Sequence, residues 1–179
     1  MEKHEWLIKL NHYDKTFEMH WLVYTGTVMV TFLTMEAITW VTHKYVMHGW
    51  LWYLHEDHHQ KSTGFFEKND MFFIIFAVPS FCFLLFGTIE SIYWLQAIGL
   101  GIMAYGLAYF IVHDVIIHQR FKWFSRSNNS YIRAIRWAHK MHHKHQDKQD
   151  GESFGMLYVH KKYREKIRKN NMLRVIQKQ

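Results

Sequence analysis

The chain has 179 residues, a length typical of one domain, and a formal net charge of +7. It contains one cysteine, Cys82, which excludes a disulfide framework and any iron–sulfur or zinc site built from cysteines. Hydrophobic residues make up 49% of the chain and gather in runs, so the composition indicates an integral membrane protein rather than a soluble domain.

The N-terminal segment, residues 1–20, mixes charged residues with Trp6, Leu10, Tyr13 and Phe17 at helical spacing. This stripe indicates a helix that lies in the membrane interface. An extension of the span that follows explains the same pattern equally well. No small-residue cleavage site comes after it, so we expect no removed signal peptide.

Three later runs are long and apolar enough to cross a bilayer. They lie at 21–42, 71–89 and 92–112. The first run carries a single acid, Glu36, and an acid inside a membrane is costly and therefore a candidate functional group. We expect Glu36 either to orient a metal-binding histidine or to bond to a neighbouring helix. Asn69 or Asp70 is expected to cap the second run, and glycines such as Gly99 indicate close packing of the third.

Beyond Gln119 the chain becomes basic, with sixteen lysines or arginines against four acids. The positive-inside rule accounts for this charge and places the C-terminal region in the cytoplasm. Nucleic-acid binding is therefore not needed to explain it. The tail at 158–179 would suit an anionic membrane surface, although a solvated, frayed tail is the simpler expectation.

Ten histidines form two copies of one pattern, H-x4-H followed by H-x2-H-H. The copies are His43, His48, His55, His58 and His59, and then His113, His118, His139, His142 and His143. Residues at i, i+3 and i+4 share a helix face, so each H-x2-H-H set is expected to converge on one point. Five residues turn a helix by about 140° net, so the H-x4-H pairs should lie near a helix end, such as Gly49, or serve different ions.

Ten imidazoles exceed the coordination sphere of a single metal, so the pattern predicts two metals with about five nitrogens each. Iron, zinc, copper and nickel all suit imidazole. The second and third spans lead out and back, which returns both histidine copies to one cytoplasmic face. The sequence thus predicts an all-α integral membrane protein with about three spans and a histidine-rich cap.

Such a centre has two main uses, the activation of oxygen by iron and hydrolysis by zinc. The segment from His55 to His59 matches H-E-x-x-H, in which Glu56 would be the general base of a zinc metalloprotease. The second copy has Lys140 at that place, and a zinc site needs only three or four ligands. The iron-dependent oxygenase is therefore the better interpretation.

The chain resembles the bacterial β-carotene 3-hydroxylases, within the fatty-acid hydroxylase family of membrane di-iron enzymes, from about Met35 to Leu157. The matching segments are HKYVMHGW, HEDHH, FEKND, AYGLAYFIVHDVIIHQRF, AHKMHH and SFGML. The resemblance implies O2-dependent hydroxylation of β-carotene at C3 of each ring, through β-cryptoxanthin to zeaxanthin. It also implies that the ten histidines bind two irons, which zinc can replace in purified protein.

The resemblance further implies electrons from reduced ferredoxin and its reductase, and a carotenoid substrate held in the bilayer. The chain itself has no dinucleotide fingerprint, which favours an external electron source. Asp114 joins Glu36 as a candidate for orienting a ligand, and His145 is an extra histidine next to the last set. A desaturase, or a hydroxylase of fatty acids or sterols, shares the histidine pattern. The sequence gives no indication of oligomeric state.

Overall fold

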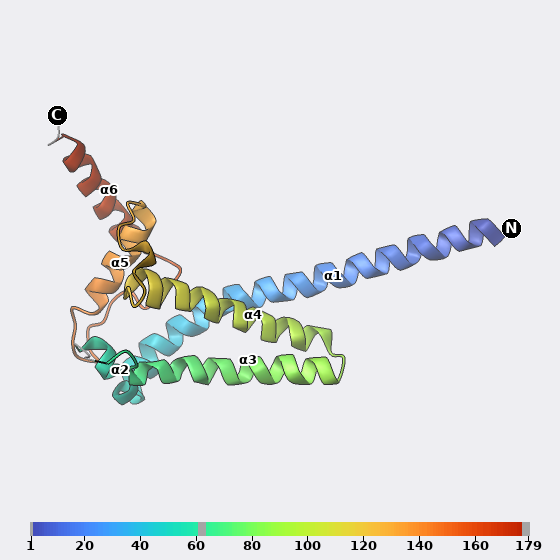
Figure 1. Cartoon of the computed structure of the whole chain (residues 1–179), viewed down its shortest axis with the longest axis horizontal. Helices are drawn as coiled ribbons and strands as arrows, with labels where there is room; N and C mark the ends of the chain where they lie inside the picture. Colours follow the sequence, from blue (N-terminus) through green and yellow to red (C-terminus); the bar gives the residue numbers. More distant parts are fainter. Residues whose placement is uncertain (1, 61–63, 177–179) are drawn as a thin grey trace.

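The computed structural model describes residues 2–60 and 64–176, with side chains described for 20–60 and 64–173. All regular elements in this part of the chain are helices joined by loops, with no strand (Figure 1). The α-helices are α1 (Glu2–Val41), α2 (Trp52–His59), α3 (Met71–Ile89), α4 (Tyr93–Phe110), α5 (Ser130–His142) and α6 (Lys161–Ile176). The π-helices are η1 (Thr42–Trp50) and η3 (Ile111–Ile117), and the 3-10 helices are η2 (Lys68–Asp70) and η4 (Lys122–Phe124).

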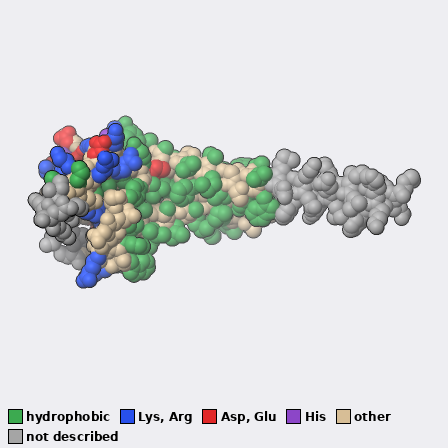
Figure 2. Space-filling view, turned by 90° about the horizontal axis from the view of Figure 1, so that it is seen from above, with side chains coloured by type: hydrophobic (Ala, Val, Ile, Leu, Met, Phe, Trp, Pro, Cys, Tyr) green, Lys and Arg blue, Asp and Glu red, His purple; other side chains and the backbone are tan. Residues whose placement is uncertain are grey.

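Three stretches of the described residues are long and apolar enough to cross a membrane. They are His20–Trp50, Lys68–Ile89 and Tyr93–Ile117, which agree with the three predicted spans. Large apolar side chains such as Leu22, Phe73 and Leu107 are exposed on their outer faces. Figure 2 shows this hydrophobic surface along the spans, with the charged side chains gathered at one end. That division suits a bundle surrounded by lipid, with a cap in water.

Close packing holds α4 between its two neighbours, as its small residues predict. A Cβ atom at Gly101 would lie 2.6 Å from the Cβ of Thr31 in α1, and one at Gly99 would lie 2.8 Å from Leu84 in α3. The Ser80 hydroxyl of α3 donates to the Gly99 carbonyl at 2.8 Å. Glycine is therefore required here for the helices to approach, and the polar hydroxyl is satisfied inside the span.

Each H-x4-H pair lies on or beside a π-helix. In η3 the His118 amide donates to the His113 carbonyl at 2.8 Å, which is the i to i+5 bond that defines this helix. Residues five apart therefore lie nearly above one another, and the mismatch expected from an α-helix disappears. Gly49 has φ −115° and ψ −118°, so the helix breaks directly after His48, as predicted.

The cap is built from α2, α5 and α6 at the end of the bundle remote from the α3–α4 turn (Figure 1). The Asn129 side chain caps α5 by accepting from the Tyr131 and Ile132 amides. Helices α5 and α6 share a small core, made of Ala134, Ile135, Ala138, Val159, Tyr163 and Ile167. The frayed tail expected at 158–179 is therefore wrong for Lys161–Ile176, because Tyr163 and Ile167 give that segment an apolar face to bury.

Residues 2–20 do not form a separate element. Helix α1 runs unbroken from Glu2 to Val41, so the backbone of this segment continues into the first span. The side chains of residues 1–19 lie outside the description. The placement of this segment in the membrane interface stays a prediction.

Candidate metal centre

The ten repeated histidines lie together where α2 and α5 of the cap meet the π-helices η1 and η3 at the ends of two spans. Eight are buried, and His118 and His143 are half-buried. The first histidine group comprises His43, His48, His55, His59 and His142, whose ligand nitrogens lie within 4.8 Å of one another. The second histidine group comprises His58, His113, His118 and His139 under the same limit, together with His143, whose Nε2 lies 2.8 Å from that of His139. The ligand nitrogens thus lie in one group of five and one group of four, with His143 next to the second.

The two H-x2-H-H sets do not each converge on one point, so that expectation is wrong. In α2, His55 and His59 belong to the first group, and His58 belongs to the second. In α5, His139 lies in the second group and His142 in the first. Adjacent helical residues point about 100° apart, so a helix that passes between two centres can supply both. Each cap helix therefore ties the two groups together.

Every ring of the first group has its Nδ1 next to an oxygen that can only accept. His43 donates to the Phe154 carbonyl at 3.0 Å, His48 to Lys148 at 3.2 Å, His59 to His145 at 2.8 Å and His142 to Glu152 at 3.0 Å, while His55 donates to Asn69 Oδ1 at 2.7 Å. These bonds place the single proton of each neutral ring on Nδ1. The Nε2 lone pairs are left free.

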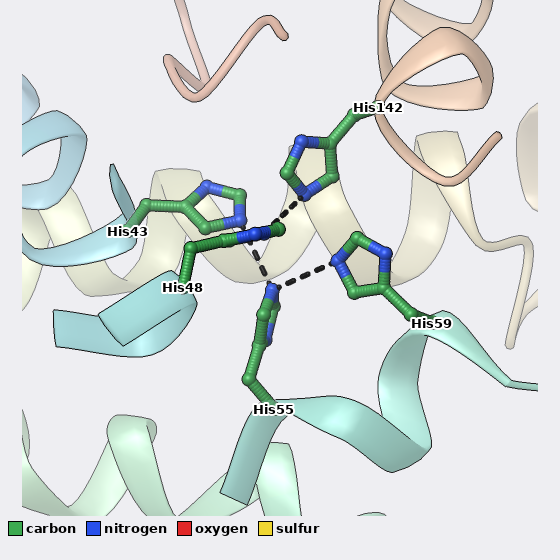
Figure 3. Close-up of side chains that lie close together, drawn as sticks. All are labelled: His43, His48, His55, His59 and His142. Carbon is green, nitrogen blue, oxygen red and sulfur yellow. Dashed lines mark hydrogen bonds between the residues drawn. The ribbon is translucent and has the colours of Figure 1, made fainter. Parts of the chain in front are cut away.

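Those free Nε2 atoms face one another at short range (Figure 3). His55 Nε2 lies 3.2 Å from that of His43 and 3.1 Å from that of His59, and the Nε2 atoms of His48 and His142 are 3.2 Å apart. Two unprotonated nitrogens at such distances repel each other. A cation among them converts the repulsion into coordination, so the donor set fits a metal ion.

Two rings of the second group, those of His58 and His113, have a carboxylate next to Nδ1, whereas most rings of the first group have a backbone carbonyl there. His58 Nδ1 donates to Glu67 Oε2 at 2.7 Å, and His113 Nδ1 lies 3.4 Å from Asp114 Oδ2. Arg120 joins these acids, with Nη2 3.2 Å from Glu67 Oε2 and Nε 3.1 Å from Asp114 Oδ1. A carboxylate makes a bonded imidazole more basic than a neutral acceptor does. The two groups are therefore chemically unequal.

Burial keeps the cap histidines neutral. Desolvation lowers the pKa of His55 to about 2, of His143 to about 3 and of His59 to about 4, from an ordinary value of 6.5. It also lowers the pKa of His58 and His139 well below that value. The neutral ring is the form that binds metal, so the rings are ready for a metal at neutral pH.

Glu36 contacts no histidine, so the expectation that it orients a ligand directly is wrong. Its Oε1 accepts from the amides of Met156, Leu157 and Tyr158 at 3.0, 2.9 and 3.0 Å. Its Oε2 accepts from the Tyr105 hydroxyl of α4 at 2.7 Å, which confirms the alternative of a bond to a neighbouring helix. Glu36 thus fixes the loop at 153–158, and the loop supplies the carbonyl that orients His43.

Several orienting groups were missed from the sequence. Asn69 and Asp70, expected to cap α3, make no such bond, and they serve His55 and Arg120. Glu67 had no predicted role, although it lies in the FEKND segment. The ring of His145 belongs to neither group. Its backbone carbonyl accepts a hydrogen bond from His59 and so orients that ring.

The metalloprotease interpretation is not supported by the position of its base. Glu56 is exposed, and its Oε1 accepts from Gln60 at 3.2 Å on the outside of α2. The histidines of the H-E-x-x-H segment also divide between the two groups. A general base must reach the metal-bound reactants, and Glu56 faces away from them.

Comparison with known proteins adds a family and several relatives. The fatty acid hydroxylase family model matches residues 28–160. The chain is 41% identical over 141 residues to a β-carotene hydroxylase of Pantoea ananas, which covers 79% of this chain and 80% of that protein. It is 37% identical over 135 residues to one of Paracoccus sp. (strain PC1), covering 74% and 82%. No solved structure matches the chain.

Proposed function

The chain belongs to the fatty acid hydroxylase family, and from that premise we propose that it hydroxylates β-carotene at C3 of each β-ionone ring, giving β-cryptoxanthin and then zeaxanthin. The observation that carries the reaction type is the buried pair of histidine groups at the end of three membrane-spanning helices. The choice of β-carotene rests on the relatives. They are named for that substrate, and the chain matches them over most of their length.

We assign one iron to each histidine group. The first would be held by His43, His48, His55, His59 and His142, and the second by His58, His113, His118, His139 and His143. When bound, the iron pair supplies the activation of O2 that an unactivated C–H bond requires, with electrons from reduced ferredoxin. Zinc also suits these nitrogens and competes for them during purification.

The protein's own contribution is to orient the ligands and keep water out. The Phe154 ring packs 5.4 Å from His43 and 5.2 Å from His48, and Trp52 packs 5.2 Å from both His48 and His59. Met156, in the same loop as Phe154, is almost fully buried. These apolar walls lower the local dielectric and protect a reactive centre from side reactions with water.

We infer that the cap lies on the cytoplasmic side of a bacterial membrane. The basic C-terminal region supports this orientation through the positive-inside rule. Lys140, Lys161 and Lys166 are exposed on α5 and α6. A basic surface at this place suits the approach of an acidic electron carrier such as ferredoxin.

The proposal is tested by expressing the chain in a bacterial host that accumulates β-carotene and supplies reduced ferredoxin. The expected result is loss of β-carotene with formation first of the monohydroxylated and then of the dihydroxylated pigment. A 4-keto product would place C4 rather than C3 at the centre and contradict the regiochemistry. Unchanged β-carotene, with hydroxylated or desaturated fatty acids or sterols instead, would move the chain to another branch of the family.

A further inference from the structure

A cavity of about 600 Å³ lies between α1 and the loop at 153–158. Its α1 wall is formed by Leu33, Ala37, Trp40 and Val41, and its opposite wall by Phe154 and Tyr158. The volume falls within the range of about 300–1,000 Å³ that is usual for small-molecule sites. None of the metal-ligand histidines lines it, so it is a separate space beside the centre.

The α1 wall of the cavity belongs to the surface that meets lipid. Leu33, Trp40 and Val41 are 64%, 38% and 48% exposed, and all three lie within the span His20–Trp50. These positions are close to the cytoplasmic end of that span, since His43 follows directly. A molecule dissolved in the bilayer could therefore enter sideways, without crossing water.

The inner wall of the cavity is also the outer wall of the first histidine group. The Phe154 ring lies 5.4 Å from the rings of His43 and His142 and 5.2 Å from that of His48. One aromatic side chain thus separates the cavity from three metal-ligand candidates. The contacts of Phe154 are with the first group, so the cavity leads to that group and not to the second.

The charges at the cavity are already satisfied, which favours an uncharged occupant. Glu36 accepts four hydrogen bonds, from three backbone amides and from the Tyr105 hydroxyl. At the aqueous rim, Lys162 is paired with Glu152. A fatty-acid carboxylate would find no free cation among these groups, whereas a hydrocarbon ring needs none.

We propose that this cavity binds the terminal hydrocarbon ring of a bilayer-dissolved carotenoid, and that Phe154 sets the approach of that ring to the first histidine group. The inference rests on the proposed function for the identity of the substrate. Gly155 lets this loop lie close to α1, because a Cβ atom there would lie 3.2 Å from Glu36 Oε1. The rest of the carotenoid would remain among lipid chains along α1.

Binding can be measured without turnover by thiol protection in iron-free protein. Ala37→Cys is placed in a Cys82→Ser background, and its reaction with a small thiol reagent is followed with and without β-carotene. The matched control is Ile38→Cys, which is exposed on α1 but outside the cavity. The proposal predicts slower labelling of Ala37→Cys alone. Equal protection at both positions, or none at Ala37→Cys, would overturn it.

The second test fills the cavity. Ala37→Trp should reduce β-carotene hydroxylation by about a hundredfold, because a displacement of the ring by an ångström is costly, while iron content stays unchanged. Ile38→Trp should remain active. If the wild-type chain is active and Ala37→Trp is equally active, the cavity proposal alone fails. If the wild-type chain hydroxylates no carotenoid, the proposed function fails, and thiol protection still reports whether a carotenoid binds.

Discussion

His58 and Glu67 meet at 2.7 Å between Nδ1 and Oε2, at the boundary between α2 and the loop that leads to α3. The carboxylate also accepts from Arg120 at 3.2 Å, so it belongs to a charged network behind the second histidine group. The first group is oriented by backbone carbonyls and by the Asn69 amide instead. The two metals are therefore expected to differ in affinity and electronic character.

Glu67→Gln should weaken metal binding at the second group by about 10–100-fold, since a carboxylate that orients a ligand histidine typically contributes that much. The measurement is metal content per chain after dialysis against a chelator, which should fall from two ions toward one. Glu56→Gln is the matched control, because Glu56 is an exposed glutamate of α2 nearby. Equal metal retention in both variants would contradict the assigned role.

His58→Ala and His59→Ala should remove different metals, although the residues are adjacent. His59 belongs to the first group and His58 to the second. Each variant should be nearly inactive, and Mössbauer spectra of iron-57 protein should lose a different signal in each case. His160→Ala serves as the control with two intact signals. Loss of the same signal from both variants would refute the interleaved arrangement.

The three spans and the clustering of the histidines could be predicted from the sequence. A membrane span can be recognised from the length and apolar composition of a run of residues. The three predicted runs agree with the three apolar helices found. The repeated spacing singled out ten histidines, and the structure brings their rings together. Gly99 and Gly101 correctly indicated close packing of α4.

The division of the histidines could not be predicted, because it depends on where α2 and α5 lie in space. Helix periodicity predicts that the side chains of His58 and His59 point in different directions. It does not predict that each of them meets a different group of histidines. The π-helices were missed for a related reason, since a 3.6-residue turn was assumed for His43 and His48. The orienting carbonyls carry no residue-type signal, and His43 and Phe154 are 111 positions apart.

Glu36→Ala should destabilise the loop at 153–158, whereas Glu36→Gln should have a milder effect on it. Alanine leaves the amides of Met156, Leu157 and Tyr158 without their acceptor, which costs about 1–3 kcal/mol at the buried residue Met156 and less at the more exposed Leu157 and Tyr158. The glutamine carbonyl can still accept from them. Limited proteolysis within 153–158, together with thermal unfolding, measures the difference. Identical behaviour of the two variants would show that this carboxylate does not hold the loop.

The metal-free protein should lose stability as the pH falls below 6.5. The folded chain holds the pKa of His59 at about 4, so between pH 6.5 and about 4 the unfolded chain binds a proton that the folded chain does not. Each such histidine lowers the free energy of unfolding by about 1.4 kcal/mol for every pH unit of acidification within this window. Thermal unfolding after chelation measures it, and His59→Gln should show a shallower dependence. A midpoint that rises on acidification would contradict the assigned neutral rings.

The most direct measurement uses purified, iron-loaded protein with β-carotene, reduced ferredoxin and isotopically labelled dioxygen. The account predicts zeaxanthin that carries one labelled oxygen atom in each C3 hydroxyl, and no label when only the water is labelled. His58→Ala should give no product under the same conditions. Hydroxyl oxygen derived from water, or undiminished product from His58→Ala, would contradict an oxygenase that works at the two histidine groups.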